Sequence, residues 1–219
     1  MKRGDLIFIL VFIGIFTPFF LSEDLYRWYL EFNRAQPLVC AFVKFAILAT
    51  MGEMLGLRIR SGKYNQKGFG LALRSLVWGF LGITIYMAFS IFATGAPKLL
   101  TNLGYEMNEQ FLNRAFVAFT ISTTMNLFYA PVMMTFHKIT DMHIAANNGK
   151  AEGFFSSFPM REYFVKLDWD TQWNFIFKKT IPLFWIPAQT INFMLPEDFR
   201  VLIAALLGIA LGVLLSIRR

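Results

Sequence analysis

The residues with the clearest potential for chemistry lie in the segment FHKITDMHI, which holds both histidines of the chain. His137 and Asp141 are four residues apart and would share one face of a helix, whereas His143 would point elsewhere if the helix continued. With no third histidine nearby, an interfacial loop is a better interpretation than a zinc site. The sequence has no nucleophile elbow, phosphate-binding loop or HExxH motif. We therefore expect no enzyme activity, no metal and no cofactor.

Two charged residues lie inside one long apolar stretch, where each costs about 2.5–3.5 kcal/mol to insert into a bilayer and so needs a partner or water. Lys44 and Glu53 are nine residues apart, which places them on opposite faces of a helix. Arg74 opens the next apolar stretch at a similar expected depth. We predict a Glu53–Arg74 ion pair; the alternative is that both side chains reach headgroup water separately.

A second polar group interrupts the apolar segment PLFWIPAQTINFMLPEDFR, at residues 182–200. Counted from Lys178, just before this segment, five residues recur at intervals of 4, 3, 4 and 3. This spacing predicts one helical stripe of Lys178, Pro182, Trp185, Gln189 and Asn192. Prolines free backbone carbonyls that are tolerated in a membrane only against protein or water, so we expect this stripe to face inward. It either joins helices by hydrogen bonds, the favoured interpretation, or borders a hydrated path.

A third polar group lies in the segment FTISTTMNLFYAPV. Ser122 and Asn126 share a helical face, and Pro131 is expected to bend the chain beyond them. Two pairs of glycines with GxxxG spacing, at 52/56 and 208/212, predict close helix packing and a capacity to oligomerise.

The elements that carry these residues are apolar enough for a membrane protein, since the chain is 56% hydrophobic and has 26 Phe among 219 residues. About 20 apolar residues span a bilayer as a helix. Six stretches approach or reach this length: 6–21, 37–57, 73–93, 111–136, 175–195 and 201–217. The first could instead be the core of a signal peptide. We predict an all-α polytopic bundle of six spans that forms a single domain over 1–219, with 1–36 as an extra N-terminal helix before a core at 37–219.

The basic residues predict the orientation, because Lys and Arg concentrate in cytoplasmic loops. With both termini inside, fifteen of the 21 basic residues are cytoplasmic, five are outside, and Lys44 is within the membrane. Because the cations are spread over all inner loops, we expect contact with lipid headgroups and no nucleic-acid partner. The segment EYFVKLDWDTQWNF, at 162–175, predicts an amphipathic helix along the inner interface.

The same C-terminal segment resembles a signature of the family of the peroxisomal membrane protein twenty-two and its mitochondrial inner-membrane relative, Mpv-seventeen. The matching positions are Pro187, Gln189, Asn192, Phe193, Pro196 and Arg200. Upstream, ATMGEMLG is similar to a Gly-Asp segment of the family, with Glu53 in place of the Asp, and Arg74 matches an Arg that opens the next helix. A Gly-Pro…His-Trp-Tyr motif of the family and an Asp-Gln pair are missing from this chain.

This resemblance implies a channel for ions or small solutes, and we expect a divergent bacterial relative in the cytoplasmic membrane. On this interpretation Lys44, Asn126 and the stripe at 178–192 border the permeation path. The alternative is a non-conducting scaffold or assembly protein in which the same amides only hold helices together. The third hypothesis, a membrane enzyme, is supported only by the histidine segment FHKITDMHI.

Overall fold

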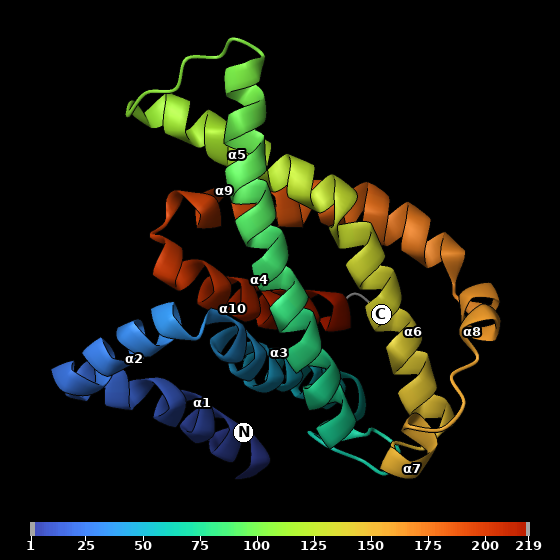
Figure 1. The fold of residues 1–219 in the computed structure, drawn as a ribbon. Coiled ribbons are helices and arrows are strands. Elements are labelled where there is room, and N and C mark those ends of the chain that lie inside the picture. The colour runs from blue at the N-terminus through green and yellow to red at the C-terminus, as the bar shows by residue number, and fades with distance from the viewer. Residues whose placement is uncertain (1–2, 218–219) are drawn as a thin grey trace.

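The computed structural model describes residues 3–217, with side chains as far as residue 213, and this part of the chain is all-α, as predicted (Figure 1). Its helices are α1 (Arg3–Leu21), α2 (Glu23–Ala35), α3 (Pro37–Ser61), α4 (Leu71–Asn102), α5 (Phe111–Phe128), α6 (Ala130–Ala146), α7 (Ala151–Phe154), α8 (Met160–Lys166), the π-helix η1 (Thr171–Trp185), α9 (Ile186–Met194) and α10 (Glu197–Ile217).

Three helices, α1, α3 and α4, are each long and apolar enough to cross a membrane. A fourth crossing is available to α5 and α6 together, which are bent by 44°. Pro131 stands in the first turn of α6, where its ring is tolerated but cannot continue the hydrogen bonding of the preceding helix, so the predicted bend is confirmed. The stretches at 175–195 and 201–217 are helical in η1–α9 and α10, and their crossing of the membrane stays a prediction.

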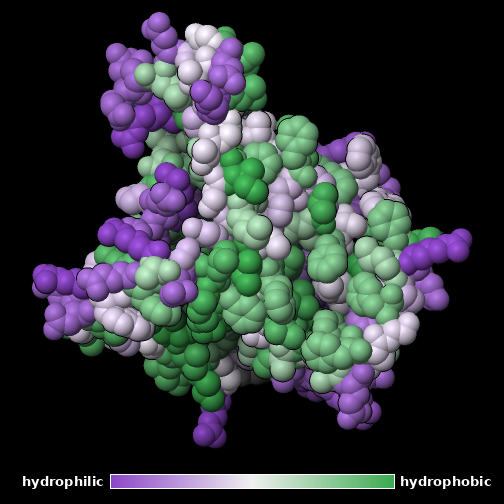
Figure 2. All heavy atoms as spheres, in the orientation of Figure 1, coloured by the Kyte–Doolittle hydropathy of each residue, from purple (hydrophilic) through white to green (hydrophobic). Residues whose placement is uncertain are grey.

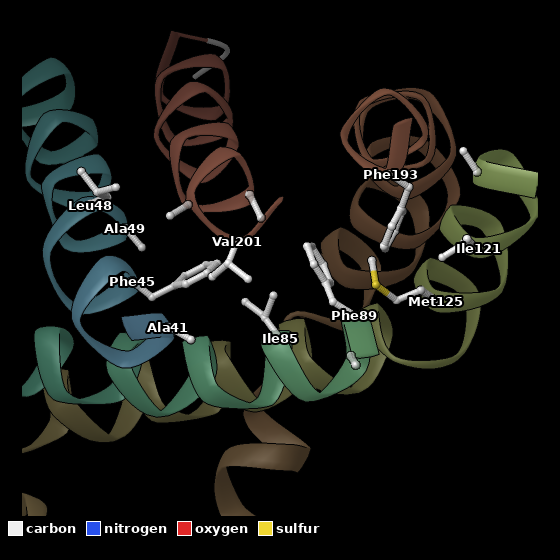
Figure 3. Close-up of a cluster of buried hydrophobic side chains, with 14 of the residues drawn as sticks. Ala41, Phe45, Leu48, Ala49, Ile85, Phe89, Ile121, Met125, Phe193 and Val201 are labelled. Atoms are coloured by element: carbon white, nitrogen blue, oxygen red, sulfur yellow. The ribbon is translucent and has the colours of Figure 1, made fainter. Parts of the chain in front are cut away.

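The long helices form one packed body in which α3 packs against both α4 and α10, while α5 packs against α9 and α4. The main core gathers apolar side chains from these helices (Figure 3). In it, the rings of Phe89 on α4 and Phe193 on α9 lie 5.0 Å apart. Phe45 of α3 and Val201 of α10 point toward the same interior.

Glycines allow the closest of these helix contacts. A Cβ built on Gly52 of α3 would lie 2.9 Å from the Cα of Ile209, and one built on Gly212 would lie 3.2 Å from the carbonyl oxygen of Gly52. One glycine of each predicted GxxxG pair therefore serves the contact between α3 and α10 within the chain.

The N-terminal region contains two helices rather than the single one predicted. Ser22 caps α2, because its Oγ accepts a hydrogen bond from Leu25 N at 3.2 Å, and this local bond starts a new helix directly after α1. On the exposed side of α2 the rings of Trp28 and Phe32 stack 5.4 Å apart. The helix thus presents an aromatic face beside the lipid-sized apolar helix α1.

The predicted amphipathic helix over 162–175 is interrupted in the structure. Helix α8 ends at Lys166, and Leu167 is extended. At the start of the next hydrogen-bonded turn, Asp168 Oδ2 accepts from Thr171 Oγ1 at 2.6 Å and Asp168 Oδ1 accepts from Thr171 N at 3.0 Å. These two bonds lower the pKa of Asp168. The position of this segment at the membrane interface stays a prediction.

The surface agrees with a membrane environment. Figure 2 shows a broad hydrophobic region over the middle of the visible face and hydrophilic side chains at its projecting ends. Large apolar side chains remain exposed along α1, including Phe20 at 86% and Leu21 at 81%. Such a continuous apolar surface is typical of a protein that contacts lipid.

Candidate functional site

Four ionisable side chains from three helices meet at one end of the bundle. Glu53 comes from the last turns of α3 and Arg74 from the first turn of α4, and His137 and Asp141 share a face of α6. We call these four residues the charged cluster. Their side chains are only 14–21% exposed, so the cluster lies largely inside the protein.

The hydrogen bonds of the charged cluster converge on Glu53. Arg74 Nη1 donates to Glu53 Oε2 and to Asp141 Oδ1, the latter at 2.6 Å. Trp78 Nε1 donates to the other carboxylate oxygen, Oε1, at 2.7 Å, and His137 Nε2 lies 3.0 Å from the same oxygen. Glu53 is thus hydrogen-bonded on both oxygens to groups from α4 and α6.

Local structure before α4 holds Arg74 in place. Gly70 precedes the helix with a φ of +70°, a left-handed conformation that favours glycine, and a Cβ there would meet Ile144 at 2.5 Å. This turn brings the carbonyl of Phe69 to Arg74 Nε at 2.8 Å. The guanidinium carbon also lies 4.7 Å from the centre of the Phe69 ring, so Arg74 is oriented by three kinds of contact.

The acidic and histidine side chains of the cluster have a spacing that metal sites also use, because one ligand atom each from Glu53, His137 and Asp141 lie within 4.8 Å of one another. The guanidinium of Arg74 already occupies both carboxylates, however. A second cation would have to bind beside it. We therefore interpret the cluster as an ion-pair network, in which the protein's own cation lies between the two carboxylates.

The predicted Glu53–Arg74 ion pair is confirmed, but the participation of α6 was missed. The predicted interfacial loop is wrong, because His137 and Asp141 lie on a continuous helix that ends at Ala146. Their spacing of four residues placed them on one helical face, and the same cytoplasmic end had been predicted for Glu53 and Arg74. These two observations place all four residues at one end of the bundle, but their contact depends on how the helices cross.

A second site, built from amides, lies between α5 and the η1–α9 segment. Asn126 is 2% exposed and donates from Nδ2 to Ser122 O at 2.9 Å. Ser122 is fully buried, and its Oγ donates to the carbonyl oxygen of Ile186 at 2.8 Å. The same carbonyl oxygen also accepts from Thr190 Oγ1 of α9, at 2.7 Å. Ser122 therefore joins the two helices, as expected for interhelical hydrogen bonding.

The amides of α9 hold the turn into α10. Asn192 is fully buried and donates from Nδ2 to Gln189 Oε1 at 2.8 Å and to Arg200 O at 2.9 Å. Arg200 in turn donates to the carbonyl oxygens of Leu195 and Phe193, at 3.1 and 3.2 Å. Four of the residues that carry the family resemblance, Gln189, Asn192, Phe193 and Arg200, thus bond across the turn between α9 and α10. Asn192 Oδ1 is buried without a hydrogen-bond partner.

The inward stripe predicted along 178–192 is wrong in its first half. Lys178 and Pro182 are exposed, Trp185 is half-buried, and only Gln189 and Asn192 are buried. The cause is η1, because a π-helix has wider turns than the α-helix from which the spacing was derived. Lys178 Nζ instead donates to Asn174 Oδ1 on the surface, at 3.1 Å.

Lys44 lies at the opposite end of α3 from Glu53 and contacts α2. It is 9% exposed, and its Nζ donates to Asn33 Oδ1 at 2.6 Å and lies 5.1 Å from the centre of the Tyr29 ring. Next to it, Arg34 Nη2 donates to Asp198 Oδ2 at 2.6 Å, and this bond lowers the pKa of Asp198. Lys44 therefore helps to fasten α2 to the bundle.

Comparison with protein-family models, with curated proteins and with solved structures finds no match.

Proposed function

We propose that this protein is an integral membrane protein that provides a permeation path for ions or small solutes, with the charged cluster at one end of that path. The observation that carries the proposal is the cluster itself: four ionisable side chains from α3, α4 and α6 converge inside an apolar helical bundle. Each such residue is costly in a membrane, and intramembrane ionisable groups mark ion and substrate pathways in membrane proteins.

Six spans with both termini cytoplasmic remain our proposed topology. The fifteen-to-five distribution of basic residues supports this orientation. The charged cluster then lies near the cytoplasmic side. The resemblance to the Mpv-seventeen family supports a channel-like role, and the bacterial cytoplasmic membrane remains our proposed location.

A non-conducting scaffold or assembly protein is the second candidate. The observation in its favour is the amide site, where Ser122, Asn126 and Asn192 are buried and bonded between or within helices. Bonds of this kind average about 0.6 kcal/mol each in a membrane protein and stabilise helix association without any path for solute. These amides therefore belong to the framework under either function, and the permeation path is expected at the charged cluster.

Purified protein in planar bilayers and in liposomes tests the proposal. We expect the protein to give a conductance in KCl and a glycerol flux above that of empty vesicles. Both should change in Glu53→Gln. Gln189→Leu is the control, because it alters a buried polar residue of the amide site. Conductance and glycerol flux equal to protein-free membranes, from a protein that is folded by circular dichroism, would leave the scaffold as the function.

A further inference from the structure

We propose that the charged cluster is a binding site for one proton, taken up by His137, and that the protein exchanges this proton between the cluster and water during transport. The part of this inference that concerns transport rests on the proposed function. The part that concerns proton binding rests only on the geometry of Glu53, Arg74, His137 and Asp141.

The hydrogen bond to Glu53 determines where the proton binds. His137 Nε2 lies 3.0 Å from Glu53 Oε1, which is hydrogen-bonding distance. An ionised carboxylate oxygen only accepts hydrogen bonds, so the nitrogen must be the donor. Nε2 therefore carries the hydrogen in the neutral ring. An additional proton from water bonds to the lone pair of Nδ1, which makes the ring an imidazolium, and breaking this N–H bond returns the proton to water.

The charge of the cluster favours a single proton. The charged groups that face the imidazole are Glu53 from α3, Arg74 from α4 and Asp141 from its own helix. Two carboxylates and one guanidinium leave a net charge of −1 beside a neutral His137. One proton on the ring makes the sum zero, whereas a divalent metal ion would reverse it to +1. Because an unbalanced charge is costly in an apolar interior, a proton suits this site better than a metal ion.

Both carboxylates are close enough to respond to that proton. Asp141 Oδ1 lies 3.8 Å from His137 Nε2 and also accepts from Arg74 Nη1 at 2.6 Å. Protonation of the ring therefore adds a second cation that competes with Arg74 for the same two carboxylates. Because those carboxylates are on α3 and α6, the proton changes the electrostatic attraction between helices at the end of the proposed path.

The chain contains its own control in His143, the only other histidine. It is 1% exposed and lies six residues further along α6. Its ring nitrogens lie 3.1 Å from Tyr163 Oη and 2.9 Å from the carbonyl oxygen of Phe154, and its ring packs among Phe154, Phe158 and Tyr163. These partners are neutral, so His143 shares the helix of His137 but has a different electrostatic setting.

The first test measures proton binding without transport. Protein with labelled histidines in lipid nanodiscs is titrated by NMR, and His143→Gln identifies which signals belong to His137. We expect His137 to take up one proton, and Glu53→Gln to move its midpoint by about one pH unit, a ten-fold change in proton affinity. Asp141→Asn is the second variant in case the first does not fold. A His137 that shows no titration, or a midpoint unchanged in the folded variants, overturns the proton site.

The second test measures movement of the proton. Liposomes that contain the protein and a pH-sensitive dye are given a potassium diffusion potential, and KCl conductance is recorded in parallel. We expect proton influx that is lost in His137→Gln and kept in His143→Gln. Conductance with no such influx would reject proton exchange during transport while the permeation path stands. Titration of His137 with neither conductance nor influx would reject the permeation path while the proton site stands.

Discussion

The charged cluster and the amide site are both polar groups buried in an apolar bundle, but they satisfy their polar atoms differently. In the amide site most partners are backbone carbonyls, such as Ile186 O for Ser122 and Arg200 O for Asn192. In the charged cluster the main partners are other ionisable side chains, from α3, α4 and α6. Backbone carbonyls exist wherever a helix passes, whereas the charged cluster needs three helices in one arrangement.

This difference predicts different energies and different roles. Removing one partner of a buried ion pair costs about 3–5 kcal/mol, since the remaining charge is left uncompensated. Loss of one interhelical hydrogen bond in a membrane protein costs about 0.6 kcal/mol on average. Residues at the charged cluster should therefore affect stability and permeation together, and residues of the amide site should affect stability alone.

The largest effect is expected for Arg74, whose guanidinium pairs with both carboxylates of the cluster. Arg74→Gln should destabilise the protein by about 3–5 kcal/mol, because Glu53 and Asp141 then face each other without a cation. Arg74→Lys should cost less, since it keeps the charge. Thermal unfolding in detergent measures both variants. If both lose the same amount, the planar guanidinium and not its charge is what the site requires.

The second effect sharpens the comparison of roles. The double variant Gln189→Leu with Asn192→Leu should lower stability by about 1–2 kcal/mol. It loses the hydrogen bond between Asn192 and Gln189 and the hydrogen bond from Asn192 to Arg200 O. Glycerol and KCl flux in liposomes should stay at the parent value. A specific change in flux in this folded double variant would place the path at the amide site instead.

A smaller effect is expected from Ser122→Ala, which removes one bond between α5 and Ile186 O. The loss should be about 0.6 kcal/mol, the average for one such bond. Thr120→Ala is the matched control on α5, because Thr120 Oγ1 donates only to Phe116 O of its own helix, at 2.9 Å. If the control lowers the melting temperature equally, the Ser122 bond contributes nothing specific between helices.

The smallest effect concerns the exposed bond between Arg34 and Asp198. Asp198→Asn should change the melting temperature by no more than about 2 °C near neutral pH, as for other exposed ion pairs. Because the bond lowers the pKa of Asp198, its stabilisation is present above the ordinary carboxyl pKa of about 3.9 and is lost as the pH falls through the lowered value. Melting curves from neutral to acidic pH should therefore converge for the parent and the variant.

The sequence predicted the helical class from composition and the bend from Pro131, and it predicted the Glu53–Arg74 pair from the similar depth of two charges on neighbouring apolar stretches. It failed along 178–185, where the π-helix changes the rotation per residue, so a spacing of four no longer means one face. It also missed the junction of α6 with α3 and α4. That junction depends on how helices cross in space, which no single span encodes.

The attachment of α1 has a consequence for how the protein is made. None of its residues is buried, and its polar link to the core is the bond of Asp5 to Arg58 and Tyr64, at 2.7 and 3.1 Å. The remaining long helices share a core that α1 only touches through Phe12 and Phe16. During synthesis α1 leaves the ribosome first, yet Arg58 and Tyr64 emerge more than fifty residues later. In the proposed topology α1 therefore enters the bilayer before its polar partners, and meets them only when α3 has been inserted beside it.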